Sequence, residues 1–225
     1  ANAKTIAADT AGNVTATIAS GTRVASLTEL RTPNGVDEEA HSWTITIHDD
    51  DATLATAADL NTINDATTEQ VTSAAVTALA ASDMTDLEAL HTGIGGFSTL
   101  ANITAVTLTD NGGGDGSVDF GTLKGIVDDY QTDVNANVAF SFQAADTIDI
   151  DTTDELSAFV EDIEDNALVL VNQAVTIDSG VGVSVANAKT IAAETAGNVT
   201  ATIENSSRVS KLTELRTPNG VDEEA

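Results

Sequence analysis

The residues best suited to chemistry are carboxylates gathered in two short segments. The first, residues 110–119, reads DNGGGDGSVD and contains Asp110, Asp115 and Asp119. Hard cations such as calcium are bound by several carboxylate and carbonyl oxygens, and glycines let the backbone curl around the ion. The sequence therefore predicts a calcium site with these three aspartates as ligands. Because the segment matches neither the EF-hand loop nor the glycine-rich calcium-binding nonapeptide, a loop of solvated acids is the alternative.

The second segment, HDDD, places Asp49, Asp50 and Asp51 directly after His48. It follows an expected strand, so these three aspartates are the second expected metal site, and a solvated turn is the alternative. Further acids gather at residues 146–154 and 161–165. The latter end an expected helix, where negative charge opposes the helix dipole. Either a cation compensates them or the cost is tolerated.

Residues for catalysis are few. His41, His48 and His91 are the only histidines, and none lies in a recognisable catalytic motif. There is no phosphate-binding loop, and the absence of cysteine excludes thiol chemistry and disulfides. We therefore expect a protein that is not an enzyme.

The charge of the chain restricts its partners. The formal net charge is −28, and Lys124 is the only lysine or arginine between Thr32 and Ala188. Nucleic-acid binding through basic contacts is thereby excluded, and an anionic membrane surface would repel the chain. No apolar run of ~18 residues predicts membrane insertion. Self-repulsion on this scale favours solubility and requires counter-ions.

The first 40 residues return near the end of the chain. Residues 1–40 and 186–225 match at 33 of 40 positions, and their starts lie 185 residues apart. We interpret residues 1–225 as one continuous slice of a tandem array with a 185-residue period. Neighbouring repeats, or identical chains placed end to end, are then the expected partners.

Strands and helices are expected to alternate within this period. Segments in which apolar and polar residues alternate predict half-buried strands at 13–18, 42–47, 70–77, 102–109, 137–142, 166–177 and 198–203. Helical spacing of apolar residues predicts helices around 2–11, 23–32, 60–63, 84–90, 123–130, 153–163 and 187–196. Asp83 and a capping box from Thr152 to Glu155 are expected helix starts. Acid- and glycine-rich residues 109–120 and 144–155 are expected surface connections.

This pattern repeats about six times per period, or ~31 residues per step, which is in the range of solenoid repeats. Strands separated by helices should pair in parallel with right-handed crossovers. We expect an α/β fold, as an elongated β/α solenoid with one strand ladder. Compact α/β domains strung as beads are the alternative, but their strands would be continuously apolar, whereas most strands here alternate.

Several phrases resemble a known kind of protein. Residues 56–68 (TAADLNTINDATT), 185–203 and 108–116 are similar to the repeats of giant Thr/Ala/Asp-rich bacterial cell-surface proteins. Among these are proteins of marine cyanobacteria, including the large swimming-motility surface protein of Synechococcus. The resemblance implies an extracellular, calcium-rich setting at the cell surface, a structural, motility or adhesive role, and a surface polysaccharide as a partner.

We therefore expect an extracellular structural repeat segment of a giant cell-surface or filament protein, stabilised by calcium. An adhesin-type binding module is the alternative. Paired outward threonines, at Thr15/Thr17, Thr44/Thr46, Thr107/Thr109 and Thr200/Thr202, also allow an ice-binding solenoid, although threonine is simply a good solvent-side strand residue.

Overall fold

The computed structural model describes residues 5, 14–19, 21–31, 41–109, 117–143 and 147–204. Within these ranges the protein has six α-helices and strands that pair in parallel. The α/β class and the parallel pairing expected from the sequence are confirmed. The chain forms two compact units: unit 1 comprises residues 1–108 and 128–138, and unit 2 comprises residues 109–127 and 139–225.

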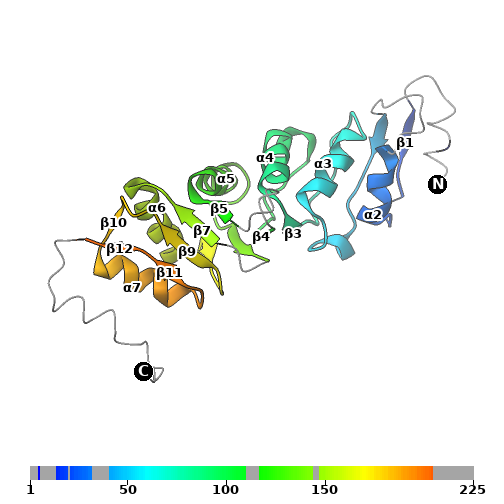
Figure 1. The fold of residues 1–225 in the computed structure, drawn as a ribbon. Coiled ribbons are helices and arrows are strands. Elements are labelled where there is room, and N and C mark those ends of the chain that lie inside the picture. The colour runs from blue at the N-terminus through cyan, green and yellow to red at the C-terminus, as the bar shows by residue number, and fades with distance from the viewer. Residues whose placement is uncertain are drawn as a thin grey trace. The chain divides into compact units, whose positions relative to one another are not determined.

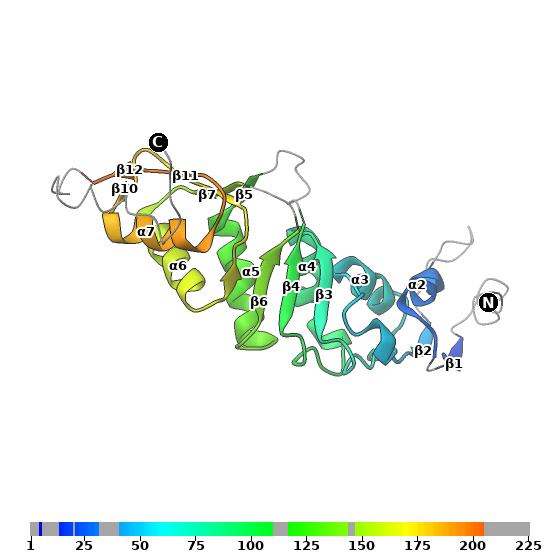
Figure 2. The same ribbon diagram turned by 90° about the horizontal axis from the view of Figure 1, so that it is seen from below.

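Unit 1 alternates short strands with helices. In chain order its elements are β1 (Thr15–Thr17), α2 (Val24–Leu27), the 3₁₀ helix η1 (Thr28–Arg31), β2 (Ser42–Thr44), η2 (Asp49–Asp51), α3 (Ala57–Asp65), β3 (Ala78–Ser82), α4 (Met84–Thr92), η3 (Ile94–Gly96) and β4 (Ala105–Leu108). Strand β1 pairs with β2, and β3 pairs with β4, both in parallel (Figure 2). Helices α3 and α4 lie side by side (Figure 1), and the Asn61 side chain donates a hydrogen bond to the Asp86 carbonyl at 2.9 Å.

Unit 2 contains a four-stranded parallel sheet. Its elements are β5 (Ser117–Asp119), β6 (Ala139–Phe142), β7 (Thr147–Ile150), α6 (Thr153–Glu164), β8 (Leu168–Val169), β9 (Ala174–Ile177), β10 (Gly182–Val183), α7 (Val185–Glu194), β11 (Val199–Thr200) and β12 (Thr202–Ile203). Four strands form a parallel sheet in the order β11-β9-β7-β5, while β6 pairs with β8 and β10 with β12. Helix α5 (Phe120–Asp133) is divided, with its residues up to Val127 in unit 2 and those from Asp128 in unit 1.

The expected periodicities explain which side chains are buried. In β7, Ile148 and Ile150 are fully buried while Thr147 and Asp149 are half-buried, because successive side chains of a strand point to opposite faces. In α5, Leu123, Val127 and Tyr130 recur at helical spacing and are fully buried.

Capping residues define where several helices begin. The capping box predicted from Thr152 to Glu155 is confirmed at the start of α6, and the same device, Thr56 with Asp59, opens α3. The Asp83 side chain accepts a hydrogen bond from the Asp86 N–H, so the predicted cap of α4 is also confirmed. The expected helix at 2–11 falls outside the described residues except for Thr5.

Two predicted strands differ from the structure. Residues 70–77 form only isolated bridges, and the strand there begins at Ala78. The chain turns because the buried Ser73 bonds to residues 98 and 99 with its backbone N–H and its hydroxyl. The single strand predicted at 166–177 is two strands, β8 and β9, in different sheets. A turn separates them, in which the Gln173 side chain accepts the Val171 N–H at 2.8 Å.

Two predicted surface connections contain strands. Residues 147–150, expected within a loop at 144–155, form the central strand β7, and residues 117–119 form β5. These segments were predicted as loops because they contain many acids. In β7, however, Ile148 and Ile150 alternate with polar residues, and this alternation buries one face of the strand.

Candidate functional site

The acidic segment after β2 begins with a histidine that caps a short helix. His48 precedes η2, and its Nδ1 atom accepts a hydrogen bond from the Asp50 N–H at 3.0 Å. Asp49 and Asp50 are exposed, whereas Asp51 is buried. The three aspartates predicted as metal ligands therefore occupy different environments within a single turn.

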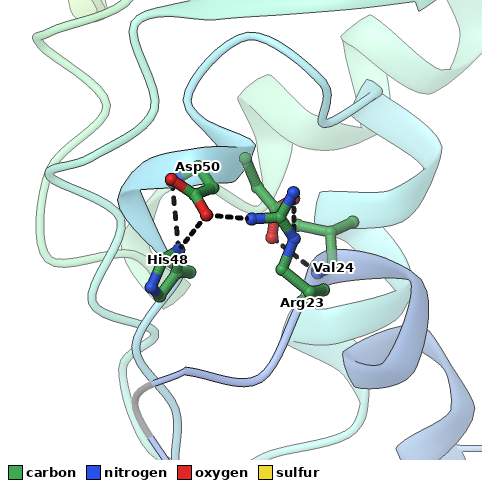
Figure 3. A network of polar contacts seen from close by, with 5 residues as sticks. Arg23, Val24, His48 and Asp50 are labelled. Atoms are coloured by element: carbon green, nitrogen blue, oxygen red, sulfur yellow. Dashed lines mark hydrogen bonds and ion pairs between the residues drawn. The ribbon is translucent and has the colours of Figure 1, made fainter.

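Arg23, which precedes α2, reaches Asp50 (Figure 3) and also Asp51. Its Nη1 atom lies 2.6 Å from Asp50 Oδ2, and its Nε atom lies 3.1 Å from Asp51 Oδ1. The other carboxylate oxygen of Asp51 accepts the Val24 N–H at 2.9 Å. Both oxygens of Asp51 thus find donors in the segment that opens α2.

This arrangement makes Asp51 a structural anchor. The Asp51 side chain is only 5% exposed, and a buried carboxylate is tolerated when it is paired and hydrogen-bonded. The Asp50 side chain is 68% exposed, so its pair with Arg23 contributes little. Sequence reasoning placed a cation at Asp50 and Asp51; in the structure the guanidinium of Arg23 faces both.

The glycine-rich segment is described only at its end. Asp110 and Asp115 lie outside the described residues. Asp119 ends β5, and its Oδ1 atom accepts hydrogen bonds from the N–H and the hydroxyl of Thr122, each at 2.7 Å. Asp119 therefore holds the first turn of α5. Its second carboxylate oxygen, Oδ2, takes part in neither of these two bonds.

Acids stand at the ends of three neighbouring strands in unit 2. Asp119 ends β5, Asp151 follows β7 and Asp178 follows β9, and we call these residues the strand-end acids. Because β5, β7 and β9 are adjacent and parallel, their carboxyl ends lie at the same edge of the sheet, about 4.8 Å apart per strand.

The strand-end acids repel one another. Partial loss of hydration, and then repulsion from Glu155, Asp119, Asp178 and Asp149, raises the pKa of Asp151 above its ordinary value of 3.8. Glu155 belongs to the α6 capping box and also accepts the Asp151 N–H at 2.8 Å, so its charge is held beside this edge. Within the described ranges, no three His, Asp or Glu side chains converge closely enough to hold a metal ion.

The acids that end α6 are partly compensated. Asp162 is buried, and its Oδ1 atom lies 3.9 Å from Lys124 Nζ on α5. Lys124, the only base in the long acidic stretch of the sequence, is therefore placed beside a buried carboxylate. A side chain of the protein thus faces one of the four acids at this helix end.

Each histidine has a structural contact. His41 is buried with its ring edge-on to Trp43 at 5.2 Å, and its Nδ1 atom accepts the Val14 N–H. His91 Nε2 lies 2.8 Å from an Asp133 carboxylate oxygen, and its Nδ1 atom lies 3.5 Å from Asp129. These contacts tie neighbouring elements of unit 1 together.

Sequence reasoning missed Arg23 as the partner of the acidic segment. A signal for it exists in the repeat: Arg23 stands within residues 19–26, where six of the eight positions differ between the two copies, and it returns unchanged as Arg208. The pairing of Lys124 with Asp162 had no comparable signal, because it depends on how α5 packs against α6.

Comparison with protein-family models, with curated proteins and with solved structures gives no match. Among the described residues, no helix combines the length and the apolar character needed to cross a membrane.

Proposed function

We propose that this chain is a structural repeat segment of a giant extracellular protein of the cell surface or of a filament. In this proposal each unit is a β/α solenoid, in which a strand and a helix form one step and successive steps stack. The function of the array is extension, and its partners are neighbouring repeats.

The observation that carries the proposal is the spacing of contacts along the chain. Parallel partners are 27 residues apart in three strand pairs, namely Thr15 with Ser42, Ala78 with Ala105, and Thr147 with Ala174. Side-chain hydrogen bonds between successive elements span similar separations, from 22 residues at Thr195–Gln173 to 34 at Asn135–Ala101. The contacts between α4 and α5 span 42 and 43 residues, across the segment that contains the glycine-rich loop.

Such spacing means that each step contacts mainly the steps before and after it. Proteins of this kind are quasi-one-dimensional, so adding repeats adds length without requiring a larger core. The side chains suit thin layers, because the buried residues are mostly Val, Ile, Leu and Ala, with only seven aromatic residues among 225. A solenoid that grows by repetition is a physical basis for extension.

The surface charge suits an extracellular setting rich in divalent ions. Like charges a few ångströms apart repel, and monovalent salt screens this repulsion only in part. Strand-end acids separated by one strand spacing therefore benefit from counter-ions. We propose calcium at the glycine-rich loop, with Asp110, Asp115 and Asp119 as ligands, and a cell-surface location.

Electron microscopy of tandem arrays tests the structural role. Chains with two, four and eight copies of the 185-residue period should form rods whose length increases in proportion to copy number. Separate beads on a flexible string would contradict the solenoid and favour the alternative of an adhesin built from independent modules. A surface polysaccharide that binds the chain would be the further support an adhesin requires.

A further inference from the structure

The repeated segment occurs twice in the chain, and its two copies use opposite edges of one strand. Residues 14–18 and 199–203 have the same sequence, VTATI. In the first copy β1 pairs with β2, which follows it in the chain. In the second copy β11 pairs with β9, and β12 with β10, both of which precede it.

The backbone groups used in the two copies are complementary. In the first copy the Val14 carbonyl accepts the Ser42 N–H at 3.1 Å, and the Ile18 N–H donates to the Thr44 carbonyl at 3.0 Å. The equivalents of Val14 and Ile18 are Val199 and Ile203.

In the second copy, residues just outside this pair bond to preceding strands. The Asn198 carbonyl accepts the Val175 N–H at 2.9 Å, and the Glu204 N–H donates to the Val183 carbonyl at 3.0 Å. Backbone groups of successive residues point to opposite sides of a strand. One strand can therefore make both sets of bonds at once.

Among the described residues, the repeated strand is less buried in both copies than a strand that has a neighbour on each side. Val14 and Ile18 are half-buried, and so are Val199 and Ile203. By contrast, Ile148 is fully buried in β7, which has a neighbour on each side. A neighbour on the second edge would cover the apolar side chains of the repeated strand in the same way.

The substitutions between the copies avoid this junction. Arg23 and Val24, which contact Asp51, return unchanged as Arg208 and Val209. Five of the seven differing positions are described in the first copy, and four of those are exposed: Ala19, Gly21, Ala25 and Ser26. The fifth is the half-buried Thr22, which becomes a serine. Arg23 is itself 46% exposed, so its retention is explained by its partners and not by burial.

The residues through which the second copy contacts earlier strands are also present in the sequence of the first copy. A Cβ atom on Gly197 would lie 2.2 Å from the Gln173 carbonyl oxygen, so only glycine fits this approach. The Thr195 hydroxyl donates to the same carbonyl at 2.6 Å. The first copy has the same residue types at these positions, Gly12 and Thr10. The sequence of the first copy is therefore compatible with the same contacts to a repeat that precedes it.

We propose that the edge of residues 199–203 is the docking site for residues 41–51 of a second copy of the repeat. Pairing follows the register of β1 on β2, so Thr200 lies opposite the Ser42 of that copy. Because Arg208 is the sequence equivalent of Arg23, which pairs with Asp50 and Asp51, we expect it to pair with those two residues of the second copy. This inference rests on the structural role proposed above and adds that repeats join by continuous sheet pairing without a flexible linker.

An extended chain tests the junction. Residues 41–109 are appended after Ala225, and Trp43→Phe in the original segment leaves the appended tryptophan as the only one. In the unextended chain Trp43 is 0% exposed. We expect the appended tryptophan to show equally blue-shifted emission and equally slow quenching by acrylamide. Emission typical of a solvent-exposed indole would overturn the proposal.

A cross-link then distinguishes docking from independent folding of the appended segment. The chain has no cysteine, so Thr200→Cys combined with cysteine at the appended equivalent of Ser42 permits one disulfide. We expect it to form within about twofold of the yield of the reference pair Thr15→Cys with Ser42→Cys. A buried appended tryptophan without this cross-link would also overturn the proposal.

Matched charge variants test the arginine contact. Arg208→Gln and Lys211→Gln each remove one positive charge from the same segment, but Lys211 stands where the first copy has the exposed Ser26. We expect Arg208→Gln to increase about tenfold the fraction of chains in which the appended segment is undocked and its tryptophan is exposed. We expect Lys211→Gln to leave this fraction unchanged. Equal effects would contradict the arginine contact.

The outcomes are separable from those of the structural role. If the junction cross-links in register while long arrays image as compact particles, extension fails and the junction holds. If arrays image as rods while the cross-link and the tryptophan burial both fail, the junction is wrong and extension holds.

Discussion

Acids that follow strands behave differently in the two units. In unit 1, Asp51 follows the strand segment of β2, is buried, and is bonded to Arg23 and the Val24 N–H. In unit 2, the strand-end acids stand side by side, and the pKa of Asp151 is raised by lost hydration and then by its acidic neighbours. The same sequence signal gives an anchor in one unit and repulsion in the other. The difference is whether a base lies within reach.

The two buried acids make this comparison sharper. Among the residues that the structure describes, the buried carboxylates are Asp51 and Asp162, and each lies beside a base, Arg23 or Lys124. The chain has only 8 lysines and arginines against 36 acids. Two of its scarce positive charges thus lie beside buried carboxylates, where pairing offsets desolvation, and exposed acids depend on solvent and counter-ions.

The largest expected effect is the loss of the unit 1 anchor. Asp51→Ala leaves the Val24 N–H and Arg23 without their buried partner, so we expect a loss of about 2–4 kcal/mol in the free energy of unfolding. Urea unfolding followed by the fluorescence of Trp43, the single tryptophan, reports on this unit. The control is Asp49→Ala, an exposed neighbour, with an expected change within about 0.5 kcal/mol. Similar losses in both variants would show that the pairing of Asp51 is unimportant.

A smaller effect is expected from calcium, and it should distinguish the units. At matched ionic strength, calcium chloride should raise the melting temperature more than sodium chloride, because a divalent ion binds where monovalent salt only screens. Amide exchange should slow more at Ile148 in unit 2 than at Ile45 in unit 1. Asp119→Asn should reduce the calcium effect while preserving the bond to Thr122. Identical responses to the two salts, with no calcium bound by calorimetry, would refute the calcium proposal.

The smallest effect is expected from removing one of the repelling charges. The pKa of Asp151 is raised in the folded state, so the fold binds its proton more tightly than the unfolded chain does. Stability is therefore lost as the pH rises through that raised pKa. Asp151→Asn should raise the melting temperature slightly at pH 7, and the gain should disappear in acid below pH ~3.8 and shrink in high salt. Asp49→Asn, which removes the same charge from unit 1, is the control. A gain that persists in acid would exclude charge repulsion as its cause.

Local sequence patterns were sufficient for much of the fold. Helices α3, α5, α6 and α7 were predicted because apolar residues recur at helical spacing and caps mark the starts of some of them. Strands β7 and β5 were missed because acids interrupt them, and the strand predicted at 70–77 was displaced by the hydrogen bonds of the buried Ser73. In both cases the segment also bonds to residues about 25 to 32 positions away, which a local pattern does not show.

The candidate site was predictable only in part. The sequence drew attention to residues 48–51 and to the acids after strands, since acids grouped near a turn are visible in one dimension. It could not show that Asp51 would be buried against Arg23, 28 residues earlier, or that Lys124 would serve Asp162. Those pairings depend on packing between steps, which places distant residues within 4 Å.

The sequence by itself determined the alternation of strand and helix, the acidic surface and the 185-residue repeat, because periodicity, composition and identity are local properties of the chain. Only the tertiary structure decided that one repeated strand pairs with a following strand in its first copy and with preceding strands in its second. The reason is physical: a strand offers hydrogen-bonding groups on both edges, and its sequence does not state which edge a neighbour occupies.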